Sequence, residues 1–422
     1  MSHPVQSIGN LAPEELTAMT DDTVDLLRAG ANQTKAFKVR EGIFVAYGFA
    51  NTIMVTTNEG NVIVDTSTAV RAPRHIQLLK AESLQPTRWV ILTHGHSDHT
   101  GGVSLWKEPD TQIIAQNNHV EFVNHQARLE GFYVLRNSAQ FDTRAPHLGR
   151  LKGNFGAKIV PTILFNDRYE FTLGGLTFEI FATPGETPDH LTVWIPEYRV
   201  ALTGDNYWGS FPNIYTLRGT RARPVLDYIN SLNKVLALKP EIVIPGHGQP
   251  VIGADMVTRR LTQYRDAIQY VHDQTVDGMN AGKSVWTLMQ EVKLPKELDI
   301  GESYGKLSWS VRGIYEGYVG WFDMNPVTMY ELPPTVVYPD IVKLAGGADA
   351  VARLAMERAQ AGRSVEALHL TDIALADDAQ NQNALEARLR ALETLREQCN
   401  NTNECGWIDY GTQLAKRKLG LR

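Results

Sequence analysis

A cluster of metal-binding side chains directly behind an apolar run constrains this chain more than any other feature. The stretch LTHGHSDHTGG, residues 92–102, overlaps the end of the run RWVIL and holds His94, His96, Asp98 and His99. Such a run predicts a buried strand, and the loop after a strand is held rigidly yet stays open to ligands. Imidazole and carboxylate groups suit zinc or a similar ion. His94 and His96 alternate on an extended segment and can face one ion, whereas Asp98 and His99 can face a second.

Strand-like runs alternate with helical stretches from Phe37 to about Gly253. Runs such as GIFVAYG, NVIVDTS, LTVWIP and EIVIPGHG are apolar and end in small or polar residues, which is typical of buried strands. The sequence Asn58-Glu59-Gly60 offers a tight turn between two of them. The alternation predicts an α/β domain in which at least one sheet is covered by helices.

Helical periodicity replaces the strand pattern in the last part of the chain. Stretches such as DAVARLAMERAQAG and NQNALEARLRALETLREQ have apolar residues at helical spacing, which indicates amphipathic helices. We therefore predict an α/β domain over residues 37–256 and an all-α domain over residues 257–422. Residues 1–36 are expected to form a polar arm with one amphipathic helix.

Charge and hydropathy exclude two broad classes of protein. The 422-residue chain has a formal net charge of −6, so it offers no broad basic surface for nucleic acid. No apolar run approaches the roughly 20 residues needed to span a bilayer. The N-terminus has no basic region followed by an apolar one, so we expect a cytoplasmic protein, although a secreted chain whose signal had been removed would look the same.

The two cysteines, Cys399 and Cys405, lie close together in the stretch CNNTNEC. Two cysteines do not make a disulfide framework. We expect both thiols to be reduced, and a small disulfide between them is the alternative.

The pattern H-x-H-x-D-H after a buried strand resembles the metallo-β-lactamase superfamily. Its fold is an αββα sandwich with a metal site at one edge. Other segments fit the same resemblance, because NVIVDTST looks like an early strand of that superfamily that ends in Asp65. The later segments TPGETPDHLTVW, ALTGDN and IPGHG bring in Glu186, Asp205 and His247.

Glu186 narrows the resemblance to the alkyl sulfatases. The common superfamily pattern has a histidine at this position, as in T-P-G-H-T, whereas the alkyl sulfatases have glutamate. Asp205 stands where that branch usually has a glutamate, and His190 is the alternative to Glu186 as a ligand, or a hydrogen-bonding neighbour of the site. Segments such as NIYTLRGT and YEGYVGWFDMNP match in order, so the similarity covers residues 37–415. The third, sterol-carrier-like domain of many alkyl sulfatases is expected to be missing.

The resemblance implies two zinc ions per chain. The ligands it implies are His94, His96 and Glu186 for one ion, Asp98, His99 and His247 for the other, and a bridging Asp205. Two ions close together can activate a water molecule near neutral pH, so Asp98 and Asp205 are the expected catalytic residues. The helical domain of this branch mediates dimerisation, which implies a homodimer.

The same resemblance implies a pocket for a small anionic ester. Arg218 offers a planar guanidinium fork to two oxygens, and Asn213 adds an amide donor. The matching residues of alkyl sulfatases bind the sulfate group. Tyr215 and Tyr318 are further candidates from the matched segments.

Two positions depart from the alkyl sulfatase pattern. Trp309 and Arg223 stand where alkyl sulfatases carry histidines, and the first of those histidines is a proposed general acid. Tryptophan and arginine are poor proton donors near neutral pH, although arginine can stabilise an anion. Both residues stay candidates for substrate contact. The alternatives to an alkyl sulfatase are a hydrolase of another ester, a phosphoester, a lactone or a β-lactam, and a binding protein without activity.

Overall fold

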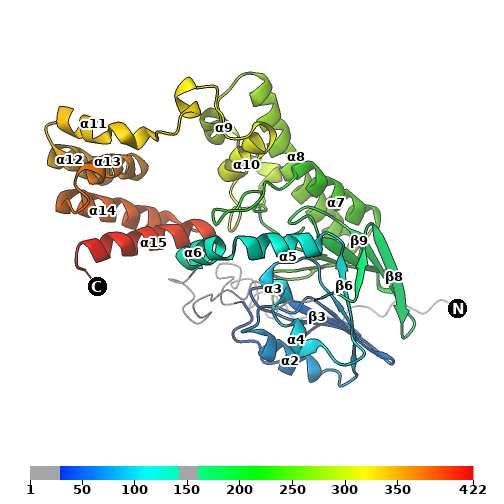
Figure 1. Cartoon of the computed structure of the whole chain (residues 1–422). Helices are drawn as coiled ribbons and strands as arrows, with labels where there is room; N and C mark the ends of the chain where they lie inside the picture. Colours follow the sequence, from blue (N-terminus) through cyan, green and yellow to red (C-terminus); the bar gives the residue numbers. More distant parts are fainter. Residues whose placement is uncertain (1–28, 142–159, 422) are drawn as a thin grey trace.

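The computed structural model of the chain describes residues 29–141 and 160–421. The helix predicted in the N-terminal arm falls outside these ranges. Within them the chain forms an α/β sandwich followed by a series of helices, as Figure 1 shows from blue to red. The predicted αββα fold with a following helical region is confirmed. Among the described residues, no helix is long and apolar enough to cross a membrane.

Two sheets make up the sandwich. The first contains, in spatial order, β1 (Phe37–Arg40), β2 (Ile43–Ala46), β3 (Thr52–Thr57), β4 (Gly60–Val64), β5 (Thr87–Ile91), β6 (Gln112–Gln116) and β7 (Ile163–Phe165). The second contains, also in spatial order, β13 (Val251–Ile252), β12 (Ile242–Pro245), β11 (Val200–Gly204), β10 (Leu191–Ile195), β9 (Leu176–Ala182) and β8 (Arg168–Leu173). Strands β3 and β4 pair antiparallel on either side of Asn58 and Glu59, so the predicted turn is confirmed.

Parallel pairing within each sheet accounts for the helices between the strands. Strands β4 to β7 pair in parallel, and β11 pairs in parallel with β12. Parallel strands need a crossover connection, usually a helix. The helices of this part are α2 (Ala72–Lys80), α3 (Ser97–Thr100), α4 (Val103–Trp106), α5 (His119–Arg128), α6 (Glu130–Phe141) and α7 (Val225–Ala237).

Apolar side chains fill the space on both faces of both sheets. Val64 and Leu202 lie in the cluster between the sheets. Trp106 lies in the cluster over the outer face of the first sheet, which α2 and α4 cover. Tyr228 and Tyr264 lie in the cluster over the second sheet, under α7 and the long helix α8 (Ala254–Asn280). Burial of this apolar surface is the main term that holds the layers together.

From Ala254 onward the described chain forms helices and no strand. After α8 come α9 (Val285–Glu291), α10 (Leu307–Val319), α11 (Tyr338–Leu344), α12 (Ala348–Gln360), α13 (Ser364–Asp377), α14 (Gln382–Gln398) and α15 (Thr402–Lys418). Helices α8 and α10 share a core with α7, whereas α11 to α14 contribute to two small clusters of their own. The predicted boundary near residue 256 therefore falls where strands give way to helices, and the packing continues across it.

Cys399 and Cys405 form a disulfide, so the prediction that both are reduced was wrong. Helix α14 ends just before Cys399 and α15 begins at Thr402, and this tight turn brings the two cysteine Cα atoms to 5.7 Å from each other. That separation suits a disulfide.

The segment between α10 and α11 exposes many large apolar side chains. The most exposed of them are Trp321, Met324, Val327, Tyr330 and Leu332. Single exposed apolar residues are common on protein surfaces, but a contiguous group usually marks an interaction surface. We call residues 320–337 the exposed apolar segment.

Candidate metal centre and adjoining cavity

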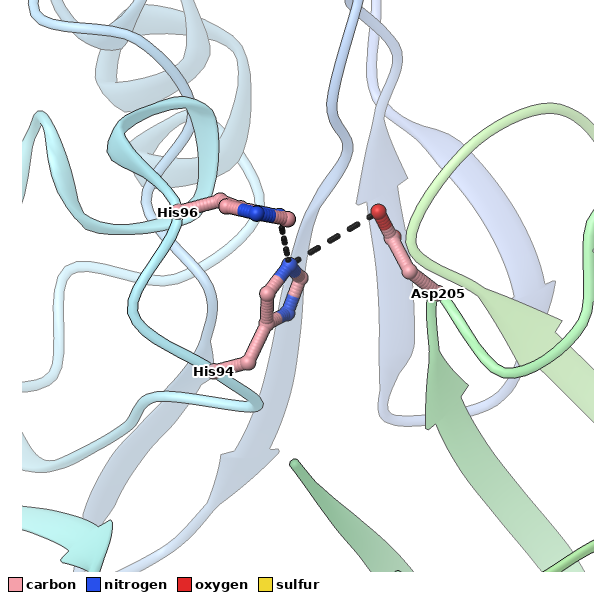
Figure 2. Close-up of side chains that lie close together, drawn as sticks. All are labelled: His94, His96 and Asp205. Carbon is pink, nitrogen blue, oxygen red and sulfur yellow. Dashed lines mark hydrogen bonds and ion pairs between the residues drawn. The ribbon is translucent and has the colours of Figure 1, made fainter. Parts of the chain in front are cut away.

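The side chains of the predicted metal site come from loops that follow strands of both sheets. His94 and His96 follow β5 of the first sheet, whereas Asp205 directly follows β11 and His247 follows β12 of the second. Glu186 lies in the loop between β9 and β10. Figure 2 shows His94 and His96 on one side and the Asp205 carboxylate pointing toward them from the other. The sandwich thus brings together residues that lie far apart in the sequence.

His94, His96 and Asp205 form the first of two clusters. The Nε2 atom of His94 lies 2.8 Å from Nδ1 of His96 and 3.7 Å from Oδ2 of Asp205 (Figure 2). One ligand atom from each residue lies within 4.8 Å of the other two. Since zinc binds nitrogen and oxygen ligands at about 2 Å, one ion could reach all three.

Asp98, His99 and His247 form the second cluster, also with ligand atoms within 4.8 Å of one another. The Nε2 atoms of His99 and His247 are 3.2 Å apart. Asp205 reaches this cluster too, because Oδ1 lies 3.3 Å from Nε2 of His99 and Oδ2 lies 3.0 Å from Nε2 of His247. Asp205 therefore lies between the two clusters.

Hydrogen bonds behind two of the imidazoles aim their Nε2 atoms at Asp205. Nδ1 of His99 lies 2.7 Å from Oδ2 of Asp65, and Nδ1 of His247 is hydrogen-bonded to the carbonyl oxygen of Phe49. The hydroxyl and backbone N–H of Thr93 hold the Asp65 carboxylate, at 2.8 and 2.9 Å. Asp65 has a φ of 57°, a conformation that costs free energy in a residue other than glycine and is often found at functional sites.

Burial and neighbouring charges set the protonation of these groups. Burial lowers the pKa of His94 and of His96 well below the usual range, so both imidazoles keep the free lone pair that a metal needs. Burial also lowers the pKa of His99, but Asp205, Asp65 and Asp98 outweigh it and hold the pKa well above the ordinary value. Burial raises the pKa of Asp205, yet the imidazoles of His247, His99 and His94 outweigh it and keep this carboxyl ionised.

Glu186 lies at the edge of the first cluster. Its Oε1 is 3.8 Å from Nδ1 of His96, and its Oε2 accepts a hydrogen bond from the guanidinium of Arg223. Burial raises the pKa of Glu186 to about 7, although Arg223 opposes this shift. One carboxylate oxygen thus faces the cluster while the other has a cationic partner.

Both ring nitrogens of His190, the alternative ligand to Glu186, have hydrogen-bond partners other than the side chains of the two clusters. Its Nε2 accepts a hydrogen bond from the backbone N–H of Asp205 at 3.1 Å, and its Nδ1 lies 3.1 Å from the hydroxyl of Thr183. The imidazole therefore positions the backbone of Asp205. This arrangement favours Glu186 over His190 as a ligand.

A cavity of about 370 Å³ opens over the clusters. Its lining includes Asp98, Glu186, Asp205 and His247 from the proposed ligand set. Aromatic side chains form much of the rest of its wall: Phe49, Phe122, Tyr133, Phe141, Trp208 and Tyr304. The cavity therefore combines a charged floor with an apolar wall, the combination expected for an amphiphilic ligand.

Only some of the predicted substrate-binding residues line the cavity. Arg218 and Arg223 line the cavity. Asn213 is buried beside it, its carbonyl oxygen accepts a hydrogen bond from Arg223, and neither polar atom of its side chain has a hydrogen-bond partner among the described residues. The other three do not line the cavity: Tyr215, Trp309 and Tyr318. Tyr318 is hydrogen-bonded to His272 on α8 instead, at 2.8 Å.

Sequence reasoning missed Trp208 and Tyr304 on the cavity wall. Trp208 stacks on His247 with ring centroids 3.9 Å apart, and Tyr304 stacks on the other side of Trp208 at 4.5 Å. Trp208 follows Asp205 by three residues, so proximity to a predicted ligand could have suggested it. No local pattern around Tyr304 points to the metal site, because tertiary packing alone brings it there.

Two family models match consecutive parts of the chain. The model of the metallo-β-lactamase superfamily matches residues 46–247, and the model of the alkyl sulfatase dimerisation domain matches residues 286–414. The first match spans strands β3 to β12, and the second spans nearly all of α9, helices α10 to α14 and most of α15.

One curated relative shows the family, and a second relative and one solved structure are also similar to this chain. The chain is 32% identical to a linear primary-alkylsulfatase of Pseudomonas sp. (strain ATCC 19151), over 87% of this chain and 74% of the relative. It is 29% identical to the alkyl/aryl-sulfatase BDS1 of Saccharomyces cerevisiae, over 85% of this chain but 60% of the relative. The inverting sec-alkylsulfatase Pisa1 from Pseudomonas sp. superposes with a TM-score of 0.83 at 24% identity, over 92% of this chain and 66% of the other, and supports the fold. The chain belongs to the alkylsulfatase family of the metallo-β-lactamase superfamily and is a metal-dependent hydrolase.

Proposed function

We propose that this chain hydrolyses alkyl sulfate esters at a site that binds two zinc ions. The observation that carries the proposal is the pair of metal-capable clusters around Asp205, at the floor of a cavity that Arg218 and aromatic side chains line. The relatives are named as alkylsulfatases, and the chain spans between three fifths and three quarters of their lengths. The substrate class is therefore argued from the site itself.

The residues present fit two divalent ions. Asp205 Oδ1 is buried and accepts no hydrogen bond of good geometry among the described residues, although Nε2 of His99 lies 3.3 Å away, and a buried carboxylate oxygen is costly unless a cation neutralises it. The imidazole and carboxylate donor set suits zinc. We propose His94, His96 and Glu186 for one ion, Asp98, His99 and His247 for the other, and Asp205 as the bridge. When bound, the ions would supply positive charge and activate a water molecule near neutral pH.

The chain's own residues would bind and orient the substrate. Arg218 is beside the carboxylates of Glu186 and Asp98. Burial lowers the pKa of Arg218, but Tyr304 and these two carboxylates raise it by a larger amount, so the guanidinium stays charged. A charged planar fork suits the terminal oxygens of a sulfate group. The aromatic wall would hold the alkyl chain and exclude water. In the reaction, water adds across the ester, and an alcohol and hydrogen sulfate are released.

The test of this proposal is a substrate panel on the zinc-loaded protein. Octyl sulfate, octyl phosphate, a γ-lactone and a penicillin would be compared at equal concentration, with release of alcohol or ring opening as the readout. We expect the highest kcat/KM for octyl sulfate. Preference for the phosphate, the lactone or the penicillin would assign the site to another hydrolase of the same fold.

We also propose that the chain acts as a homodimer. The match to an alkyl sulfatase dimerisation domain supports this, and so does the exposed apolar segment, which lies within the matched residues. Trp321 and Met324 are 71% and 78% exposed in the single chain. Covering such side chains with a second copy would remove a large apolar area from water, which is the usual driving force for stable homodimers.

A further inference from the structure

Tyr304 lies in the wall of the cavity, although it is far in the sequence from the loops that carry the proposed metal ligands. The side chain is 6% exposed and lines the cavity. Its ring lies nearly parallel to Trp208, at 12°, and the opposite face of Trp208 lies nearly parallel to His247, at 14°. One indole ring therefore separates Tyr304 from a proposed zinc ligand.

Two asparagines at the start of α15 hold the backbone of Tyr304. The side-chain amides of Asn401 and Asn403 donate to its carbonyl oxygen, at 3.1 and 2.9 Å. Asn401 also donates to the carbonyl oxygens of Glu302 and Gly305 on either side. A segment fixed by this many hydrogen bonds presents its side chain in a defined position, as a binding site requires.

The positive charge of Arg218 acts on the hydroxyl group of Tyr304, and both side chains line the cavity. A guanidinium has N–H donors and no acceptor, so the O–H of Tyr304 cannot donate to Arg218 and is left to donate elsewhere. The part of the chain that the structure describes provides no acceptor for that O–H. Burial raises the pKa of Tyr304 to about 12, against the lowering effect of Arg218, so the hydroxyl stays protonated at neutral pH.

We propose that the Tyr304 hydroxyl donates a hydrogen bond to the anionic head group of the substrate, beside the guanidinium of Arg218. This inference rests on the proposed function, because it needs an anionic group in the cavity. Arg218 polarises the hydroxyl and makes it a stronger donor, and the two side chains together offer three or more donors to one sulfate group.

The test compares the zinc-loaded wild type with two single-hydroxyl deletions. Tyr304→Phe removes the proposed donor. Tyr207→Phe is a matched control, since Tyr207 is also buried and feels the charge of an arginine, Arg260, but does not line the cavity. The first readout is the Kd of 1-octanesulfonate, an anion that the enzyme cannot hydrolyse, by isothermal titration calorimetry. The second is kcat and KM for octyl sulfate.

We expect Tyr304→Phe to weaken octanesulfonate binding about tenfold or more, as the loss of a hydrogen bond to a charged group does, and Tyr207→Phe to leave the Kd within twofold of wild type. Equal Kd values for Tyr304→Phe and wild type, in an enzyme that hydrolyses octyl sulfate, overturn this inference and leave the proposed function standing. A wild type that neither binds octanesulfonate nor hydrolyses octyl sulfate overturns both. Zinc content and melting temperature confirm that both variants are folded.

Discussion

Arg223 donates a hydrogen bond to the carboxylate of Glu186 inside the site, and the two side chains are only 3% and 4% exposed. This ion pair takes up Oε2 of Glu186 and leaves Oε1 facing His96. Burial alone would favour the protonated carboxyl. Arg223 therefore helps to keep Glu186 in the ionised form that a metal ligand needs, which gives a function to a residue that departs from the alkyl sulfatase pattern.

Arg223→Ala is expected to destabilise the zinc-free protein by about 3–5 kcal/mol, because it leaves a buried carboxylate without its partner. With zinc bound the loss should be smaller, since an ion beside Glu186 provides another positive charge. Urea unfolding with a chelator and with zinc measures both values. Arg221→Ala is the control, because Arg221 lies on the same cavity but is exposed. Equal losses with and without zinc would place Glu186 away from the ion.

Metal binding is expected to depend on the two clusters jointly. His96→Ala combined with Asp98→Ala takes one ligand from each cluster, so zinc content measured by elemental analysis should fall from about two ions per chain to none. Activity should be lost with it. His125→Ala is a suitable control, because His125 also lines the cavity but belongs to neither cluster. Full zinc content in the double variant would show that the ligands have been assigned wrongly.

The exposed apolar segment is expected to hold the dimer together. Light scattering at micromolar concentration should give the mass of two chains for the wild type. Replacement of both Trp321 and Met324 by serine should shift the mass toward one chain, whereas Trp286→Ser, at a position on α9 that is 59% exposed and lies outside this segment, should not. If the wild type has the mass of one chain, the proposed homodimer is wrong.

Acidification is expected to destabilise the fold through His75. Its Nδ1 lies 2.9 Å from the hydroxyl of Thr52 and its Nε2 lies 3.0 Å from the carbonyl oxygen of Tyr47. Burial lowers the pKa of His75 from 6.5 to about 4, although the Tyr47 carbonyl raises it. The unfolded chain then binds the extra proton first, so the stability contributed by neutral His75 is complete above pH 6.5 and is lost as the pH falls toward 4.

The measurement is urea unfolding of the zinc-loaded protein at pH 7 and pH 5. The shift of His75 should account for about 2 kcal/mol of the decrease in stability, at about 1.4 kcal/mol per pH unit. His75→Gln removes the titrating group, so its stability should be lower at pH 7 but should decrease less on acidification. If His75→Gln loses as much unfolding free energy between pH 7 and pH 5 as the wild type does, the result argues against a buried neutral imidazole at this position.

The part of the metal site between His94 and His99 could be predicted from the sequence, because these ligands lie within six consecutive residues. His94 and His96 alternate on one short segment after a strand, and no knowledge of the fold is needed to see that both can face one ion. Asp205 and His247 are single residues in ordinary strand ends, so only the resemblance to a family pointed to them. Their positions depend on how two sheets pack.

The residues that were missed or misjudged depend on tertiary geometry. Tyr304 reaches the cavity because Asn401 and Asn403 of a distant helix hold its backbone, and no local pattern in the sequence contains that contact. Tyr318 matched a family segment, yet its hydroxyl is bonded to His272 outside the cavity. Cys399 and Cys405 are six residues apart, and sequence separation alone does not say whether a turn brings their Cα atoms within bonding range.

The central claim is that Arg218 binds the charged head of an anionic ester above the metal centre. The most direct measurement is kcat/KM of zinc-loaded Arg218→Ala for octyl sulfate and for a neutral ester such as octyl acetate, with Arg221→Ala as the control arginine on the same cavity. A charge-assisted hydrogen bond contributes about 1.5–3 kcal/mol, so we expect a decrease of roughly tenfold to a hundredfold or more for octyl sulfate. Zinc content and any hydrolysis of the neutral ester should stay nearly unchanged. An equal decrease on both substrates would mean that Arg218 is structural, and would contradict the account of this chain as an alkylsulfatase.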